Sequence, residues 1–184
     1  NDHGSTSDWG KTLEEYLQLA QSNVVFYDGL FFSIAVENLG YANGINIKLD
    51  GEILYVAETV GKKLTMYSRN TVTYKLPFLQ SIEMHSGVDN IELDDKGNLW
   101  IGSHPKLLTF TRHAKDADAL SPSQVLRLTP KAENDFVIEE IFLSKGDDLS
   151  GSSVGAVFGN TLLIGSVFES HFLSCTINQQ DGSN

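Results

Sequence analysis

The sequence predicts an all-β protein assembled from the repeated four-stranded sheets of a β-propeller, with one amphipathic helix near the N-terminus. Short runs rich in Val, Ile, Phe and Tyr, broken by Gly, Asn and Asp, extend from about residue 23 to about residue 177. A strand, a tight polar turn and a second strand begin at Asn46 and recur at Asn90, 44 residues later. Helical spacing of apolar residues occurs only before these runs.

The helix is expected at about residues 9–20. Its apolar residues recur at helical spacing: Trp9, Leu13, Tyr16, Leu17 and Ala20. Thr12 and Glu15 form the Thr-x-x-Glu pattern of a capping box. The apolar face of such a helix usually packs against a core, so we expect it to cover part of the propeller.

The repeat predicts the blades. Residues 46–57 read like residues 90–102, and residues 157–165 are a weaker third copy. Further hairpin strands are expected after the first two copies, at residues 64–68 with 74–76 and at residues 107–111 with 124–128. Four strands in about 40 to 45 residues is the period of a propeller blade.

The number of blades predicts an incomplete ring. The 184 residues hold two full blades and parts of one or two others, whereas propellers close with about four to eight. An open arc would expose edge strands, which natural sheets avoid. We therefore expect residues 1–184 to be about half of a propeller, completed by a missing segment or a second chain. A truncated protein and a β-sandwich remain alternatives.

Charge and composition exclude some functions. The chain has 13 basic and 24 acidic residues, a net charge of −11, so it should repel a phosphate backbone and we expect no nucleic-acid partner. No run approaches the roughly 18 apolar residues of a membrane span. The single cysteine, Cys175, is either a buried thiol or half of a disulfide with a partner elsewhere. His85, His113 and His171 have no partner at ligand spacing and are expected on the surface or in loops.

Two polar stretches, residues 41–46 and 87–91, occupy equivalent places in successive blades. The innermost strands of a propeller converge on its channel, so side chains from these stretches should meet there. Amide and carboxylate oxygens suit calcium, which takes about six to eight oxygen ligands. Asn43, Asp89 and Asn90 are the candidate calcium ligands. The alternative is that these residues only serve turn geometry.

Four ordered motifs resemble the paraoxonase/arylesterase family. They are Tyr-Ala-Asn-Gly-Ile-Asn at 41–46, Val-Asp-Asn-Ile at 88–91, Gly-Asn-Leu-Trp-Ile-Gly-Ser-His-Pro at 97–105 and Leu-Leu-Ile-Gly-Ser-Val-Phe at 162–168. The resemblance extends from the first residues to Cys175. It implies that the chain is the C-terminal half of a six-bladed propeller with calcium as cofactor.

The resemblance also implies roles for single residues. Asn43, Asp89 and Asn90 match the family's ligands of the catalytic calcium. Other residues match positions at or near the active site: Asp2, His3, Trp100 and His104. A further set matches residues that line the family's pocket: Ser153, Val167 and Phe168. Without the resemblance these residues would be interpreted as strand-end, turn or core residues, and for Trp100 we favour blade packing.

The implied activity is calcium-dependent hydrolysis of small lactones and aryl esters, with organophosphate triesters as substrates of some members. Calcium would polarise the carbonyl or phosphoryl oxygen, and Asp89 would be ligand, base or nucleophile. The family's paired histidines and its remaining ligands belong to the N-terminal half, so the active site is incomplete in this chain alone. The alternative is a non-catalytic, calcium-stabilised propeller that binds a protein or assists folding.

The resemblance also implies a disulfide for Cys175, a cellular compartment and a contact with lipid surfaces. Cys175 matches a cysteine whose disulfide closes the ring, with its partner outside this chain, which implies an oxidising, extracellular compartment. Ser103 stands where the family often has a free cysteine. The family's helix near residues 9–20 covers the active site and helps to seat the protein on lipoprotein or membrane surfaces. Here its polar face is acidic, with Glu14 and Glu15, unlike most membrane-surface helices.

Overall fold

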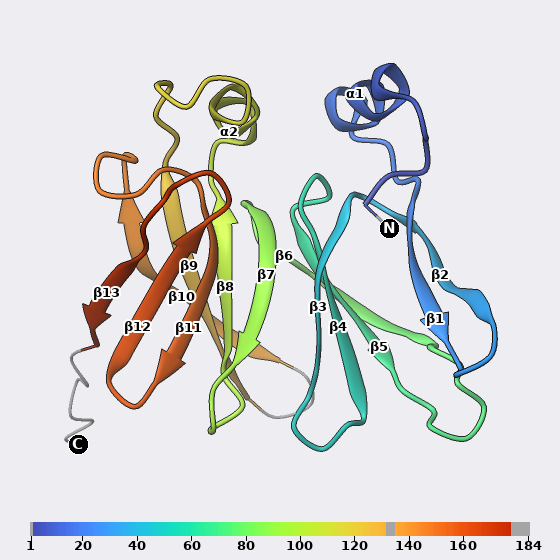
Figure 1. The fold of residues 1–184 in the computed structure, drawn as a ribbon. Coiled ribbons are helices and arrows are strands. Elements are labelled where there is room, and N and C mark those ends of the chain that lie inside the picture. Colours follow the sequence, from blue (N-terminus) through green and yellow to red (C-terminus); the bar gives the residue numbers. More distant parts are fainter. Residues whose placement is uncertain (1, 132–134, 178–184) are drawn as a thin grey trace. The chain divides into compact units, whose positions relative to one another are not determined.

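The computed structural model describes residues 2–131 and 135–177. The chain divides into two compact units, Asn1–Asn90 and Ile91–Asn184, and each is described by itself. The described residues form four antiparallel sheets and two helices (Figure 1). The prediction of an all-β fold is therefore confirmed, with a second short helix that the sequence did not predict.

The first unit contains one helix and two sheets. Its elements are α1 (Asp8–Leu17), β1 (Ser22–Tyr27), β2 (Phe32–Leu39), β3 (Ala42–Ile47), β4 (Ile53–Glu58), β5 (Lys63–Ser68) and β6 (Phe78–Glu83). β1 and β2 form a two-stranded sheet, and β3 to β6 follow one another in a four-stranded sheet. This up-and-down order of four strands is that of a propeller blade.

The second unit repeats the pattern, and β7 crosses the division between the units. The elements are β7 (Gly87–Leu93), β8 (Leu99–His104), α2 (Leu107–His113), β9 (Ser123–Pro130), β10 (Phe136–Ser144), β11 (Ser152–Phe158), β12 (Thr161–Ser166) and β13 (Leu173–Thr176). One sheet has the order β10-β9-β8-β7 and the other has the order β11-β12-β13. The pairs β3–β4 and β7–β8 are the two copies of the 44-residue repeat, as predicted.

Helix α1 is shorter than the expected range of 9–20. It begins after Ser7, whose hydroxyl accepts a hydrogen bond of 3.1 Å from the backbone N–H of Gly10. It ends because Gln18 takes a left-handed conformation, with φ of 53°. The capping box predicted from Thr12 and Glu15 is wrong, since both residues lie inside the helix.

Two predicted strands are wrong. Residues 74–76 belong to the loop before β6 and follow a turn at 71–73, in which the Asn70 side chain accepts hydrogen bonds from the backbone N–H groups of Val72 and Thr73. Residues 107–111 form helix α2 instead of a strand. In this helix the Thr111 hydroxyl donates back to the Leu107 carbonyl oxygen at 3.0 Å, and Phe110 packs on the ring of His104.

Each unit has its own apolar core between two successive sheets. The core of the first unit contains Leu39, Ala42, Leu54, Val56 and Tyr67. That of the second contains Trp100, Val125, Leu149, Leu162 and Ile164. These residues come from adjacent sheets, which is the face-to-face packing of propeller blades.

Trp100 is a packing residue, as favoured from the sequence. Its ring is buried in the core of the second unit, and its Nε1–H donates to the Asp94 carboxylate at 3.0 Å. Burial raises the pKa of Asp94, but hydrogen bonds from Trp100, from the Asn98 side chain and from two backbone N–H groups outweigh it and hold that pKa below its ordinary value. Asp94 therefore ties the turn between β7 and β8 to the core.

Candidate functional site

The predicted metal ligands of the first unit lie at the beginnings of β3 and β7. Asn43 is the second residue of β3, and Asp89 and Asn90 are the third and fourth residues of β7. The pairing of β3 with β4 is irregular between Ala42 and Ile45, so Asn43 lies in a β-bulge. Bulges of this kind turn side chains away from the regular pleat and are common next to active sites.

Thr59 joins the two strands that carry these residues. It follows the last residue of β4, and its buried hydroxyl donates to the Val88 carbonyl oxygen at 2.7 Å. The same hydroxyl accepts a hydrogen bond of 3.2 Å from Nδ2 of Asn43. The structure therefore brings the Asn43 side chain to the part of β7 that precedes Asp89.

The chemistry of the predicted ligands fits calcium. Asp89 is only 4% exposed, whereas Asn43 and Asn90 are exposed, and each of the three carries a hard carboxylate or amide oxygen. Asp89 and Asn90 are consecutive strand residues, so both can ligate one ion only where β7 departs from the regular alternation of side chains. Within residues 2–131 and 135–177, no three His, Cys, Asp or Glu side chains form a metal cluster. A calcium ion held here would therefore depend on amide oxygens as well as on Asp89.

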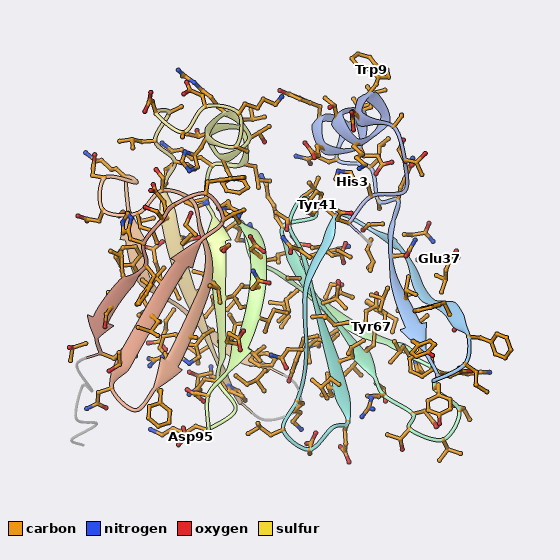
Figure 2. The ribbon with its side chains drawn as sticks, viewed as in Figure 1. His3, Trp9, Glu37, Tyr41, Tyr67 and Asp95 are labelled. Carbon is orange, nitrogen blue, oxygen red and sulfur yellow. The ribbon has the colours of Figure 1, made fainter. Side chains whose placement is uncertain are left out.

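Asp2 and His3 belong to a second polar group in the first unit. Both ring nitrogens of the buried His3 face carboxylates: Nε2 lies 3.1 Å from Glu15, and Nδ1 lies 3.3 Å from Asp2 without hydrogen-bond geometry. The His3 ring meets the Tyr41 ring edge to face, with centroids 4.8 Å apart. Both residues are labelled in Figure 2. Glu15, which the sequence analysis assigned to a capping box, thus orients a predicted site residue.

Tyr41 is the link between this group and Asp89. Its backbone is left-handed, with φ of 62°, a conformation that a bulky residue rarely takes. Burial, and then the negative charges of Asp2, Glu15 and Asp89, raise the pKa of Tyr41 to about 12. Asp2, His3, Tyr41 and Asp89 therefore share one electrostatic environment, in which the phenol stays protonated at neutral pH.

Helix α1 is anchored to this region by Glu14. The carboxylate of Glu14 is buried and accepts hydrogen bonds from the backbone N–H groups of Gly4 and Ser5, at 2.9 and 2.6 Å. The apolar face of helix α1 was expected to be buried, but it is exposed: Trp9 is 74% exposed and Tyr16 is 59% exposed. Figure 2 shows Trp9 pointing away from the strands of the unit. The prediction that this face packs as core is therefore wrong.

The second unit gathers His104 and part of the predicted substrate pocket around helix α2. The buried His104 ring stacks on Phe110, with centroids 3.6 Å apart and planes inclined by 17°. The Phe110 ring lies 6.0 Å from that of Phe168, between centroids. Gly151, with φ of 62°, makes room for this cluster, because a Cβ atom there would lie 2.9 Å from the Phe110 ring.

The remaining predicted pocket residues differ in exposure. Ser153 is buried at the start of β11, and Val167, just after β12, is 57% exposed. Ser153 lies against Gly102 of β8, where the two backbones approach so closely that a Cβ atom would not fit. His104 and Ser153 therefore lie at the same end of two adjoining sheets.

His113 is buried and is not the surface residue predicted from the sequence. It lies at the end of α2, and its Nδ1–H donates to the Ala119 carbonyl oxygen at 3.0 Å. Its ring meets the Phe168 ring edge to face, with centroids 5.6 Å apart. His113 is three residues after Phe110, a spacing that places both side chains on one face of a helix. This signal was missed because residues 107–111 were predicted to form a strand.

Cys175 lies on β13 opposite Leu162 and is half-buried against the core of the second unit. Its thiol is unpaired in the described part of the chain, and the expected partner lies outside this chain, so the disulfide stays a prediction. None of the helices within the described residues is long and apolar enough to span a membrane.

The sequence is similar to known proteins over most of its length. Residues 1–177 match the arylesterase family. Human serum paraoxonase/arylesterase 1 is 34% identical over 169 residues, which cover 91% of this chain and 47% of that protein. Human serum paraoxonase/arylesterase 2 is 32% identical over 172 residues, with the same shares covered. The chain spans about half the length of the curated relatives that it matches.

A likeness to a solved structure supports the fold. The structure of a luciferin-regenerating enzyme aligns with a TM-score of 0.52 at 14% sequence identity. The alignment covers 74% of this chain and 40% of that one. The arrangement of the strands is thus shared at low sequence identity.

Proposed function

Because the chain belongs to the arylesterase family, we propose that it supplies part of the active site of a calcium-dependent hydrolase of aryl esters and lactones. The observation that carries the proposal is the hydrogen-bonded link from Asn43 through Thr59 to Val88. It brings an amide beside the strand that carries the buried carboxylate of Asp89. These are the donor types that calcium prefers.

Calcium, when bound, would polarise the substrate carbonyl and stabilise the charge that develops on its oxygen. Asn43, Asp89 and Asn90 would hold the ion, and Asp89 would be its negatively charged ligand. Glu15 would fix the orientation of His3 through Nε2. Within the second unit the rings of Phe110 and Phe168 lie 6.0 Å apart between centroids, and Ser153, Val167 and Phe168 are the residues that the family resemblance assigns to the substrate pocket.

Three narrower proposals accompany this one. Organophosphate triesters are a further substrate class, since the same ion can polarise a phosphoryl oxygen. The propeller is completed by a segment or chain outside these residues. The sheet of β1 and β2 supports this proposal, because it has two strands where a full blade has four. Cys175 is bridged to that segment in an oxidising, extracellular compartment.

The test is hydrolysis of phenyl acetate and a simple lactone by the natural protein, with calcium and with a chelator. We expect wild type to be active only with calcium and the Asp89→Ala variant to lose activity and calcium binding together. Asp50→Ala is the matched control, because Asp50 is a half-exposed turn carboxylate paired with Lys48. It should leave both properties unchanged.

The outcomes separate the candidate functions. Hydrolysis that survives the chelator, or that survives Asp89→Ala, would contradict the calcium-dependent mechanism. Tight calcium binding without hydrolysis of any ester or lactone would instead favour the non-catalytic, calcium-stabilised propeller. Absence of both would show that these three residues are not a calcium site.

A further inference from the structure

We infer that Thr59 is a positioning residue that sets the orientation of the Asn43 amide and thereby the affinity of the calcium site. The inference rests on the proposed function, because it assigns a role toward the proposed ion. It concerns a residue that neither the motifs nor the composition of the polar stretches singles out. Two hydrogen bonds and one strand irregularity, all within the first unit, support this role.

The two hydrogen bonds of Thr59 fix the direction of each donor. A hydroxyl has one proton, and the Val88 carbonyl oxygen, 2.7 Å away, can only accept. The Thr59 hydroxyl therefore donates its proton to the Val88 carbonyl oxygen and must accept the hydrogen bond from the Asn43 side chain, at 3.2 Å. Only the NH₂ end of an amide can donate. The oxygen end of Asn43 is consequently turned away from Thr59 and is the end that can ligate a cation.

The strand itself does not supply this restraint. Asn43 lies in the bulge between Ala42 and Ile45, where the regular pairing of β3 with β4 is interrupted. Its side chain is exposed, so burial does not hold it in one rotamer either. Without a partner for its NH₂ group, the amide could rotate and present its nitrogen to a cation. The Thr59 hydroxyl removes that freedom.

Thr59 is itself held firmly. Its side chain is buried, and its backbone N–H donates to the Tyr41 carbonyl oxygen at 3.0 Å. Tyr41 is thereby linked to the residue that also contacts Asn43 and Val88. Thr59 thus connects the beginning of β3 with the beginning of β7, and residues that orient metal ligands in this way commonly change metal affinity by about 10- to 100-fold when they are replaced.

The experiment measures calcium affinity of the natural protein by titration calorimetry for Thr59→Val, Thr59→Ala and Thr59→Ser. Val and Ala remove the hydroxyl, with and without keeping the branched shape, whereas Ser retains it. We expect Val and Ala to weaken calcium binding about tenfold and Ser to bind like wild type. In an Asn43→Ala background, Thr59→Val should cause no further loss, because its effect acts through Asn43.

Thermal unfolding in chelator separates positioning from stability. Ser123→Ala is the control, since Ser123 is a buried hydroxyl of the second unit that also bridges two backbone groups. We expect it to lower the unfolding temperature without changing calcium affinity. Unchanged calcium affinity in Thr59→Val, or equal losses of affinity in Thr59→Val and Thr59→Ser, would overturn the inference. The calcium site itself would still stand in that case if Asn43→Ala weakens calcium binding. Absence of calcium binding in wild type would overturn both.

Discussion

Replacing Gly102 by alanine should separate the two sheets of the second unit. A Cβ atom at this position would lie 2.2 Å from the carbonyl carbon and 2.4 Å from the carbonyl oxygen of Ser153. Ordinary contacts begin at 3.4 Å, so β8 and β11 would have to move apart by about 1 Å. The neighbours are backbone atoms, which cannot rotate away as a side chain can. Overpacking of this kind costs about 1–3 kcal/mol, and we expect the upper end or beyond.

The assay is denaturant unfolding of the natural protein, with Gly165→Ala as the matched control. A Cβ atom at Gly165 would meet only a methyl group of Val154, at 2.9 Å, which can shift. We expect Gly102→Ala to lower the unfolding free energy by about 3 kcal/mol and Gly165→Ala by less than about 1.5 kcal/mol. Because Gly102 is two residues before His104, ester hydrolysis should fall as well. Equal effects of the two substitutions would refute the backbone-contact argument.

Three further predictions follow. Asp94→Asn should lower the free energy of unfolding above pH 4 by about 1–3 kcal/mol, because it weakens the hydrogen bond with Trp100. Hydrogen bonding holds the pKa of Asp94 low despite its burial, so the difference in stability between wild type and Asp94→Asn should shrink as the pH falls below about 4. The phenol of Tyr41, whose pKa is raised to about 12, favours the folded state fully below pH 10 and loses that contribution as the pH rises toward 12. Tyr41→Phe should therefore be less sensitive to alkaline unfolding than wild type in this window. We predict that the exposed Trp9 and Tyr16 bind phosphatidylcholine vesicles in a flotation assay and that Trp9→Ser with Tyr16→Ser loses this binding; wild type that does not bind would refute lipid association through α1.

The regular part of the fold was predictable because its pattern is local. The strands on either side of the Asp50-Gly51 turn alternate or run apolar over six residues, and the pattern recurs 44 residues later. Helix α2 was not predictable by this means. Its sequence alternates between apolar residues such as Phe110 and β-branched threonines, which is typical of a strand. The helix forms where Phe110 stacks on His104, and this contact depends on the tertiary structure.

The candidate site was predictable in part for the same reason. Asn43 and Asp89 belong to the two polar stretches, residues 41–46 and 87–91, that begin successive copies of the repeat, so their location at the beginnings of β3 and β7 follows from the blade pattern. Thr59 was missed because Thr-Val-Gly after a strand reads as an ordinary turn. Its role becomes visible only when the hydroxyl is seen between Asn43 and Val88.

The irregular backbone at the beginning of β3 needs a cause, and Glu58 provides it. Tyr41 is left-handed and Asn43 lies in a bulge, conformations that persist only where surrounding contacts hold them. The Glu58 carboxylate, 1% exposed, accepts a hydrogen bond of 2.6 Å from the backbone N–H of Gly40, next to Tyr41. A buried carboxylate is costly unless its oxygens are paired, and here the second oxygen accepts from Thr65. Glu58 therefore holds the chain in the shape that places Asn43 beside Thr59, which explains why a buried carboxyl group stands at the end of β4.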